Sequence, residues 1–360
     1  MKIVLTGGFL GSGKSTAIRQ ACGILFGMDR KAAVITNDQG LQQVDSAYMK
    51  AENIPVCSVS NGCFCCRYPE LDQHLTTLTN QFEPELIFAE SVGSCTDLIA
   101  TVVNPLLQFR PAATVVLSIF ADARMLLKIA EGQSVQFDST VQYIYEKQLE
   151  EADILVLTKV DLLKDEEWEP LRQQLLNMYP GKQVLFQNST NPEDVLEWLN
   201  AIAQFEPPTH RKSLDIDYTL YGQGEAMLAW LDEELELDSI TEDAPVIAHQ
   251  LIEQIYQQIR QHYLPIGHLK FFLSYGNHQE KISFTHTDEV YLKPTDTQEK
   301  SRRATLLINA RIQTTPEHLH QLVSEQLYAL LSAQDKLTIR VKEMAAFQPG
   351  FPTPTHRISS

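Results

Sequence analysis

Short apolar runs alternate with amphipathic stretches over residues 1–204 of the chain. The runs have the length of buried strands, and the stretches between them carry apolar residues at helical spacing. The predicted strands are Lys2–Thr6, Ala32–Asn37, Ile54–Val59, Leu86–Ala89, Ala113–Phe120, Ile154–Leu157 and Gln183–Phe186, and the predicted helices are Ser15–Cys22, Pro69–Leu78, Val141–Glu151 and Pro192–Ile202. We expect Asp38–Met49 to form an irregular loop. Strands that alternate with helices predict an α/β fold, in which helices cover both faces of a mainly parallel sheet.

The pattern changes after residue 204, where Phe205–Lys212 contains two adjacent prolines and is predicted to be a linker. The predicted strands beyond it are Leu214–Leu220, Leu269–Ser274, Lys281–Thr285, Thr305–Ile312 and Leu337–Val341, and the predicted helices are Ala226–Leu235, Val246–His262 and Pro316–Leu331. This arrangement indicates a smaller α+β domain with antiparallel strands. The predicted division is therefore a first domain at 1–204, a linker at 205–212, a second domain at 213–347 and a proline-rich tail at 348–360.

The net charge of the chain disfavours some classes of binding partner. Its 360 residues carry a formal net charge of −17 and no long basic run, which disfavours nucleic acid and anionic membrane surfaces. The acid-rich segment Asp232–Asp243 is expected to be a solvated helix end. Met1 and Lys2 lead directly into a strand, so we expect no signal peptide, and no apolar run is long enough to cross a bilayer. We therefore expect a cytoplasmic protein whose six cysteines are thiols.

The first turn of the chain carries the pattern G-x-x-x-x-G-K-[ST], placed between a predicted strand and a predicted helix. Backbone amides of such a loop, with the positive end of the helix dipole, surround a phosphate chain. The predicted nucleotide-binding residues of this loop are Gly8, Leu10, Gly11, Ser12, Gly13, Lys14, Ser15 and Thr16. Lys14 would reach the β- and γ-phosphates and Ser15 would ligate Mg²⁺, so the first domain is predicted to be a P-loop NTPase.

An acid follows the predicted strand Leu86–Ala89. Glu90 stands where P-loop proteins hold Mg²⁺, and with Lys14 and Ser15 it completes the predicted catalytic set. Gly93 resembles the glycine whose amide meets the γ-phosphate in switch-type GTPases. A plainer interpretation stays open, in which Glu90 only caps a loop at the end of a strand.

The stretch from Thr158 to Asp161 resembles the N-K-x-D motif that selects guanine. Asp161 can accept from N1–H and the exocyclic amino group of guanine, a pairing that adenine cannot offer. The stem of Lys159 would lie over the base. Thr158 stands where the motif has Asn, and it offers one hydroxyl to the loop or the base. The predicted nucleotide is therefore GTP.

Three of the six cysteines are clustered, at Cys63, Cys65 and Cys66. This is not the spacing of a structural zinc site, which needs two separated pairs, and we expect adjacent cysteines to turn toward one ion with difficulty. A metal site here would be open or completed from elsewhere, with Asp38 and His74 as candidates. Thiolates favour Zn²⁺, with Co²⁺ or Ni²⁺ as alternatives. Two interpretations without a metal stay open: a redox-sensing thiol pair, and cysteines that only pack in the core. The cysteines expected to be buried small apolar residues are Cys22, Cys57 and Cys95.

Together these motifs resemble those of the CobW-type P-loop GTPases, relatives of the accessory GTPases that insert nickel into hydrogenase and urease. The matching stretches are Gly7–Thr16, Gly62–Cys66, Glu90–Gly93 and Glu150–Leu163. The resemblance is strong over the first domain and extends more weakly to the layout of the second. It implies a GTPase that binds a transition metal at the three cysteines and acts as a metallochaperone or cofactor-assembly factor for a client protein.

The resemblance also places switch I at Thr36–Gly40. The family usually has Asn-Glu there, so the shorter Asp38 leaves its role toward Mg²⁺ or the second metal open. Glu90–Gly93 replaces the more usual E-T-T-G but keeps its acid and its glycine. Some relatives with a tail like that at residues 352–357 are linked to corrinoid metabolism, which keeps cobalt as a minority hypothesis.

These expectations combine into a nucleotide-driven metal cycle, in which the chain between Cys66 and Glu90 transmits the nucleotide state to the thiolates. We expect slow intrinsic hydrolysis, because no arginine finger or positioned glutamine is identifiable, although Gln39 is a candidate for orienting water. Two other functions stay open: a P-loop ATPase or kinase, and a nucleotide-stabilised metal store or thiol redox sensor. The expected partner is a client metalloprotein or cofactor-assembly protein, and a homodimer is left open.

Overall fold

The computed structural model of the chain describes residues 1–40, 43–131, 137–208, 211–288 and 300–359. It divides into two compact units, the first made of Met1–Gln39, Glu52–Gly224 and Phe351–Ser360 and the second of Gly40–Ala51 and Glu225–Gly350. This division differs from the predicted one, since residues 213–224 and the tail join the first unit while Gly40–Ala51 joins the second. Parts of the predicted loop (41–42), linker (209–210) and tail (360) lie outside the described residues.

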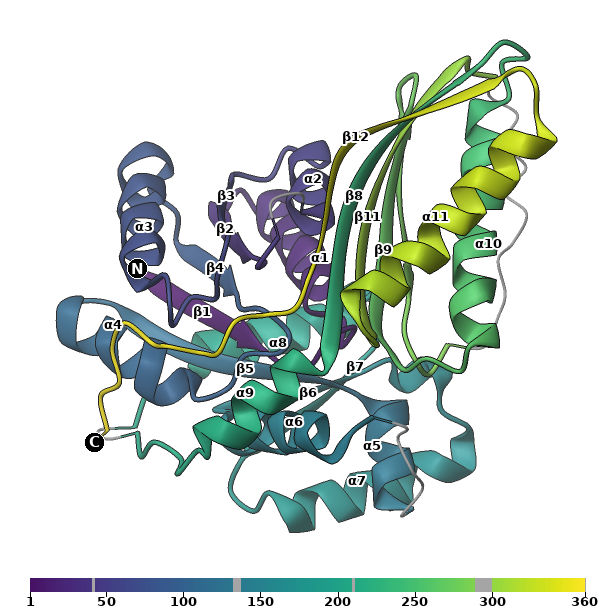
Figure 1. Cartoon of the computed structure of the whole chain (residues 1–360). Helices are drawn as coiled ribbons and strands as arrows, with labels where there is room; N and C mark the ends of the chain where they lie inside the picture. Colours follow the sequence, from purple (N-terminus) through teal and green to yellow (C-terminus); the bar gives the residue numbers. More distant parts are fainter. Residues whose placement is uncertain (41–42, 132–136, 209–210, 289–299, 360) are drawn as a thin grey trace. The chain divides into compact units, whose positions relative to one another are not determined.

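A seven-stranded sheet forms the centre of the first unit (Figure 1). Its strands are β1 Lys2–Gly7, β2 Ala32–Asn37, β3 Val56–Val59, β4 Leu86–Glu90, β5 Thr114–Asp122, β6 Ile154–Thr158 and β7 Gln183–Gln187. They pair in parallel in the order β3-β2-β4-β1-β5-β6-β7. Because the strands are parallel, the loops that follow β1, β3, β4 and β6 leave from one edge of the sheet, where α/β proteins bind ligands.

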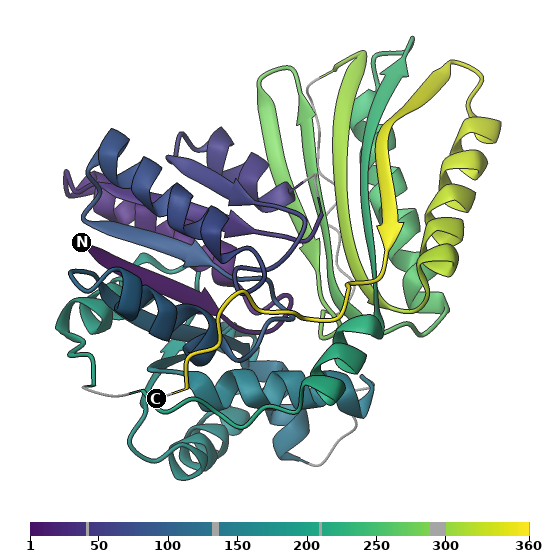
Figure 2. The same cartoon turned by 60° about the vertical axis from the view of Figure 1, so that its left-hand side comes forward.

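Helices cover both faces of this sheet (Figure 2). They are α1 Lys14–Gly27, α3 Tyr68–Phe82, a π-helical turn at Ile99–Val103, α4 Asn104–Phe109, α5 Ala123–Ala130, α6 Ser139–Glu151, a 3₁₀ turn at Val160–Leu162, α7 Asp165–Met178, α8 Pro192–Gln204 and the start of α9 Tyr218–Ala226. Trp198 of α8 is fully buried and meets Phe120 of β5 edge to face, with ring centroids 5.0 Å apart. Its indole N–H donates to Ser118 Oγ at 3.1 Å, so this large side chain buries apolar surface without leaving a polar group unsatisfied.

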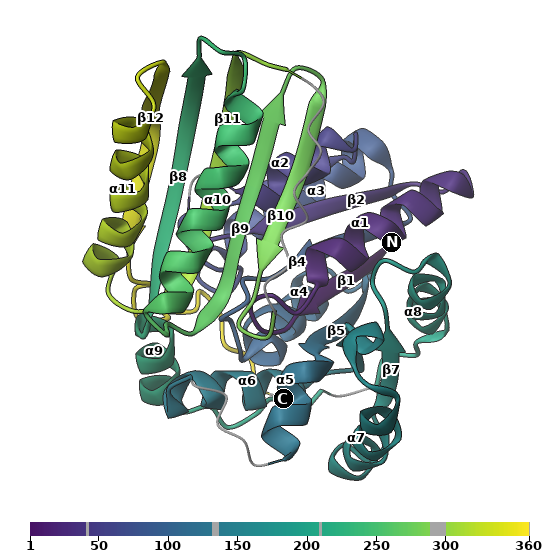
Figure 3. The same ribbon diagram turned by 90° about the vertical axis from the view of Figure 1, so that its right-hand side faces the viewer.

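The second unit is an antiparallel sheet with helices (Figure 3). Its strands are β8 Leu228–Ser239, β9 Ile266–Tyr275, β10 His278–Phe284, β11 Arg303–Gln313 and β12 Leu337–Phe347, in the order β10-β9-β11-β8-β12. Its helices are α2 Val44–Ala51, α10 Ala244–Gln261 and α11 Pro316–Ala333. The two long helices pack on each other and on the sheet around one apolar core, while α2 packs on β9, β10 and β11. The predicted α/β domain followed by a smaller α+β domain is confirmed.

Two element predictions in the second half are wrong. The predicted helix Ala226–Leu235 is the strand β8, whose buried leucines at 228, 231 and 235 happen to match helical spacing. Pairing with β11 on one side and β12 on the other overrides that local pattern. Residues Asp232–Ser239 of the acid-rich segment therefore belong to this strand, with Asp232 and Glu233 buried, and they are not a solvated helix end.

The predicted strand Leu214–Leu220 gives way to α9, because Asp217 accepts from the backbone N–H groups of Thr219 and Leu220 at 2.8 and 3.2 Å and starts the helix. The predicted irregular loop contains α2. The predicted linker is anchored, since buried Arg211 pairs with Asp153 at 2.8 Å. Among the described residues, the structure has no helix long and apolar enough to cross a membrane.

Candidate functional site

The phosphate loop (Gly8–Thr16) turns sharply between β1 and α1. Gly8 has φ = 121°, and a Cβ on it would lie 2.1 Å from the carbonyl oxygen of Phe120, so only glycine fits there. Lys14 is buried and its Nζ donates to the carbonyl oxygens of Gly8 and Phe9 at 2.6 and 3.1 Å. The loop therefore holds the lysine ammonium group in the hollow that its own backbone encloses.

Glu90 ends β4, and it lies beside Thr6 at the end of β1. Ser15 Oγ, at the start of α1, donates to Glu90 Oε1 at 2.8 Å, and both side chains are buried. A hydroxyl and a carboxylate together at a phosphate loop form an all-oxygen donor set, which fits Mg²⁺. The geometry brings together two of the three predicted catalytic residues, and their catalytic roles stay predictions.

The segment after Glu90 lies directly on the phosphate loop. A Cβ on Gly93 would stand 2.9 Å from the backbone nitrogen of Leu10, so this approach requires glycine. Fully buried Gln148 of α6 fixes the segment by donating to the carbonyl oxygens of Gly93 and Cys95 at 3.0 and 2.7 Å. Sequence reasoning missed Gln148, because a glutamine on an amphipathic helix carries no signal of its own.

A second buried side chain of α6 supports the same segment further along. Glu151 accepts from the backbone N–H of Ile99 at 3.0 Å and from Thr96 Oγ1 at 3.3 Å. Burial raises the pKa of Glu151 to about 7, although these hydrogen bonds act in the opposite direction. Helix α6 therefore positions the whole segment from Gly93 to Ile99.

The guanine-like motif follows β6. Thr158 Oγ1 donates to Ser12 O at 2.7 Å and to Ala121 O at 3.2 Å, so the residue that replaces Asn ties β6 to the phosphate loop. Lys159 has φ = 59° and its Nζ lies 2.9 Å from Asp122 Oδ2. Asp161 is exposed in the 3₁₀ turn that follows. The roles of these three residues toward a base stay predictions.

Asp122 is a further residue that sequence reasoning passed over. It ends β5, caps α5 by accepting from the backbone N–H of Arg124 at 3.0 Å, and pairs with Lys159. Burial would raise its pKa, but Lys159 and Arg124 outweigh that effect and lower the pKa of Asp122 to about 2. It therefore stays ionised and holds the lysine of the motif in place.

The thiol loop (Gly62–Cys66) follows β3. Its chain makes one helical turn, in which the backbone N–H groups of Cys66 and Arg67 donate to Cys63 O at 3.0 and 2.8 Å. The sulfur of Cys63 lies 2.6 Å from that of Cys65 and 3.4 Å from that of Cys66, and the last two sulfurs are 3.6 Å apart. This differs from the expectation that adjacent cysteines face one ion only with difficulty, because the helical turn brings all three sulfurs within 4.8 Å of one another.

This cluster suits a soft metal ion. The three sulfurs all lie within 4.8 Å of one another, and neither Asp38 nor His74 joins them in the part of the chain that the structure describes. His74 instead meets the carbonyl oxygen of Ser58 at 3.1 Å. Hydrogen bonds from the thiols of Cys65 and Cys66 hold the pKa of Cys63 well below that of an ordinary thiol. Of the three thiols, Cys63 is therefore the one that loses its proton most readily.

Residues far away in the sequence hold the thiol loop. Asn37, at the end of β2 and within the predicted switch I, donates to Gly62 O at 2.7 Å and accepts from the backbone N–H of Phe64 at 2.8 Å. In the tail, the backbone N–H of Thr355 donates to Cys65 O at 2.8 Å and its hydroxyl to Cys66 O at 3.0 Å. The backbone N–H of Thr353 donates to the Cys66 sulfur.

The tail is also anchored beyond the thiol loop. The ring of His356 packs against those of Tyr68 and Phe109, each at 5.1 Å between centroids. Arg357 Nε donates to fully buried Asp97 at 2.8 Å. The proline-rich tail therefore forms part of the first unit and supports the site.

Cys95 stands beside the thiol cluster, a position that sequence reasoning did not assign to it. It is 1% exposed, and its side chain hydrogen-bonds with those of Cys63 and Cys65. Its place five residues after Glu90 was the available signal, because that segment leaves from the same sheet edge as the thiol loop. Cys22 is buried as expected, in α1, and Cys57 is half-buried in β3.

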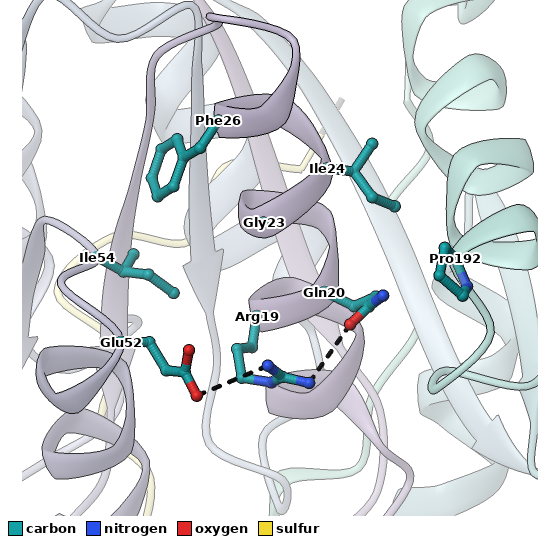
Figure 4. A pocket seen from close by; sticks show the side chains of 8 residues that line it. All are labelled: Arg19, Gln20, Gly23, Ile24, Phe26, Glu52, Ile54 and Pro192. Carbon is teal, nitrogen blue, oxygen red and sulfur yellow. Dashed lines mark hydrogen bonds and ion pairs between the residues drawn. The ribbon is translucent and has the colours of Figure 1, made fainter.

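A pocket of about 290 Å³ lies along α1, away from these groups (Figure 4). Its polar contacts are those of Arg19, which lies 3.7 Å from Glu52 and donates to Gln20 at 3.3 Å. None of the predicted site residues lines it. The chemistry of this chain therefore belongs to the sheet edge and not to this pocket.

Comparison with known proteins finds relatives that are named zinc chaperones. The chain is 26% identical over 245 residues to a protein named zinc chaperone CobW from Pseudomonas aeruginosa, covering 58% of this chain and 64% of the relative. It is 30% identical over 171 residues to zinc chaperone YjiA from Escherichia coli (strain K12), covering 46% of this chain and 51% of the relative. The chain spans between 48% and 64% of the length of the curated relatives it matches.

A solved structure and a family model complete the comparison. The structure of HypB from Helicobacter pylori in complex with nickel has a TM-score of 0.43 and 13% identity, covering 58% of this chain and 90% of that one, too distant to support a conclusion. The model of the family described as CobW/HypB/UreG, nucleotide-binding domain, matches residues 2–186, which include the phosphate loop, the thiol loop and the motif after β6. The chain therefore belongs to the CobW/HypB/UreG family, and the resemblance found in its sequence is confirmed.

Proposed function

We propose that this chain is a GTP-hydrolysing metallochaperone that carries zinc on Cys63, Cys65 and Cys66 and delivers it to a client protein. One observation supports this most directly. The segment that begins at Glu90 touches the phosphate loop through Ser15 and Gly93, and it ends beside the thiols at Cys95. A nucleotide and a metal bound at these places would therefore act on one short piece of chain.

The nucleotide chemistry rests on the phosphate loop. Lys14 would exchange its two carbonyl partners for β- and γ-phosphate oxygens, and Ser15 and Glu90 would hold Mg²⁺, which neutralises charge on those oxygens. Asp161 would select guanine. We expect turnover to be slow, since no residue is identified that supplies an arginine finger or orients the attacking water, Gln39 being a candidate.

The cargo follows from the donor set and the relatives. Thiolates favour Zn²⁺ among the divalent ions open to this site, with Co²⁺ and Ni²⁺ next. Two relatives from different organisms are named zinc chaperones, which supports the same choice. The client, the corrinoid link and any self-association stay hypotheses from the sequence.

The test is Zn²⁺ affinity by chelator competition with no nucleotide, with GDP and with a non-hydrolysable GTP analogue. We expect affinities that differ by about tenfold between nucleotide states, a coupling of about 1.4 kcal/mol. Cys65→Ser should remove the difference, and Thr190→Ser, at an exposed position after β7, should keep it. Equal affinity in all three states would reject the nucleotide-driven cycle.

The 2.6 Å separation of the Cys63 and Cys65 sulfurs favours a second candidate, a nucleotide-stabilised thiol redox sensor. This alternative predicts zinc binding that ignores the nucleotide, and no turnover. A third candidate is a P-loop ATPase or kinase. Competition between GTP and ATP for binding to the chain distinguishes it from the proposed GTPase. If Asp161→Ala leaves the base preference unchanged, the guanine assignment fails and the third candidate gains.

A further inference from the structure

Three thiolates leave one corner of a zinc site open. With Zn–S bonds of about 2.3 Å, the sulfurs of a tetrahedral site stand about 3.7 Å apart. Cys66 lies 3.4 and 3.6 Å from the other two sulfurs, which is close to that spacing. Cys63 and Cys65 are only 2.6 Å apart, so they must separate when a metal enters.

Cys95 adds a fourth sulfur at this place. Its side chain hydrogen-bonds with those of Cys63 and Cys65, so it already contacts the pair that must separate. Within the described part of the chain, no carboxylate, imidazole or further thiol lies within 4.8 Å of all three sulfurs. Cys95 meets two of the three sulfurs, those of Cys63 and Cys65, and its sulfur would complete a tetrahedron by moving toward Cys66.

The backbone around Cys95 is fixed before any metal binds. Its N–H donates to Val92 O at 3.0 Å, and its carbonyl oxygen accepts from Gln148 at 2.7 Å. The sulfurs of the thiol loop receive backbone donors too, since the N–H of Cys66 bonds to Cys63 Sγ and that of Thr353 to Cys66 Sγ. Such outer contacts are what orients thiolate ligands and balances their charge in metal sites.

We propose that Cys95 is the fourth ligand of the zinc carried by Cys63, Cys65 and Cys66, which closes the site as a tetrahedron of four thiolates. This inference rests on the proposed function, because it adds a ligand to the same metal site. A site closed by four protein ligands holds zinc tightly, whereas three ligands leave a position open for exchange.

The position of Cys95 gives the site its control. It stands two residues after Gly93, whose approach to Leu10 leaves no room for a Cβ. A displacement of this segment when a γ-phosphate is bound or lost would move the Cys95 sulfur with it. With Cys95 in place the zinc is retained, and with Cys95 withdrawn the fourth corner is free for a ligand from the client.

The test counts the sulfur ligands of zinc in the full-length protein. Zinc-edge X-ray absorption with one equivalent of Zn²⁺ and no nucleotide should show four sulfurs in the wild type. It should show three sulfurs and one lighter atom in Cys95→Ser. Chelator competition should give zinc affinity at least about tenfold weaker in this variant, and Cys95→Ala should behave alike if serine perturbs the packing.

Cys22→Ser is the matched control, because Cys22 is as buried as Cys95 but lies in α1. It should keep four sulfurs and the wild-type zinc affinity, and thermal unfolding without metal checks that each variant folds. Three sulfurs in the wild type, or an unchanged affinity in both Cys95 variants, would overturn the inference. If either result were found while zinc affinity still depended on the nucleotide, only the assignment of Cys95 as a ligand would be rejected, and the proposed function would stand. A wild-type protein that binds no zinc would overturn both the inference and the proposed function.

Discussion

The phosphate loop and the thiol loop follow parallel strands of the same sheet, β1 and β3, but they are built by different means. The phosphate loop works through its own backbone, in which Gly8, Gly11 and Gly13 have positive φ and two carbonyl oxygens hold Lys14. The thiol loop works through side chains. Its geometry depends on Asn37 from β2, on Thr355 from the tail, and on contacts from Cys95.

This difference matters for how each site can change. A site made of backbone amides has its shape before the ligand arrives. A site made of thiols held from three directions changes when any one of its supports moves. The nucleotide site is therefore suited to be the input of a switch, and the thiol site is suited to be the output.

The largest effect is expected from Lys14→Ala, which breaks the input. Loss of the ammonium group that is proposed to face the transferred phosphate should lower the rate of GTP hydrolysis by roughly 10²–10³. Zinc affinity without nucleotide should not change, because Lys14 Nζ bonds to the carbonyl oxygens of Gly8 and Phe9 in its own loop, and the three thiols belong to a different loop. The measurement is phosphate release under saturating GTP.

Lys164→Ala is the control for that measurement, since Lys164 is largely exposed after the guanine-like motif. It should keep the wild-type rate. If the Lys14→Ala variant still hydrolysed GTP at the wild-type rate, the activity would not depend on the phosphate loop. The phosphate loop would then not be the input of the switch.

A second test addresses the segment that joins the two loops. Burial raises the pKa of Glu151 to about 7, above its value of 4.5 in an unfolded chain. A carboxyl whose folded pKa is raised favours the folded state when it is protonated, so its contribution is lost as the pH rises from about 4.5 to 7. The wild-type free energy of unfolding should fall by about 3 kcal/mol across that window because of this group.

In the Glu151→Gln variant, this decrease in the free energy of unfolding should be absent, because glutamine does not titrate. The glutamine carbonyl oxygen still accepts from the backbone N–H of Ile99. The free energy of unfolding of both proteins is measured in urea at pH 4.5 and pH 7.5. Burial also raises the pKa of Glu233 to about 7, but Glu233 is present in both proteins. The difference between the two proteins therefore reports the contribution of Glu151 alone. Parallel pH profiles for the two proteins would show that Glu151 does not titrate as its burial implies.

The two loops also differ in how far the sequence predicted them. The phosphate loop, Glu90 and the guanine-like motif are contiguous patterns with a required context, and each of them lies at the carboxyl end of a strand of the parallel sheet. The cysteine motif was visible as well, but its supports were not. Asn37, Gln148 and Thr355 act through side chains or backbone groups whose partners lie far away in the sequence, and no periodicity marks such contacts.

The fold shows the same boundary between local and distant information. The parallel strands of the first unit were predicted because each buried run is apolar on both faces. Strand β8 was predicted to be a helix, because its leucines fit a helical spacing until β11 and β12 pair with it. Helix α2 was missed because the chain around it is polar and its apolar face is covered by distant strands.

A smaller effect is expected where the guanine-like motif meets the phosphate loop. Thr158→Val removes the hydroxyl that donates to Ser12 O and Ala121 O but keeps the shape of the side chain. Loss of these bonds should cost about 1 kcal/mol, or about fivefold in GTP affinity. Thr158→Ser keeps the hydroxyl and should bind as the wild type does. Equal GTP affinities for the Val and Ser variants would mean that the hydroxyl does not stabilise the loop.

The smallest effect is expected from the tail, and it concerns only the thiol loop. Thr355→Ala removes the hydroxyl that donates to Cys66 O and leaves its backbone bond to Cys65 O intact. One exposed hydrogen bond contributes roughly 0.5–1 kcal/mol, so the rate of zinc transfer to a chelator should rise about threefold. Thr353→Ala is the matched control, because Thr353 contacts Cys66 through its backbone N–H, which the substitution keeps. GTP affinity should be equal in both variants, since the hydroxyl of Thr355 and the backbone N–H of Thr353 both bond to the thiol loop. A tail variant that altered GTP affinity and zinc transfer together would mean that the two loops are coupled more tightly than their separate supports suggest.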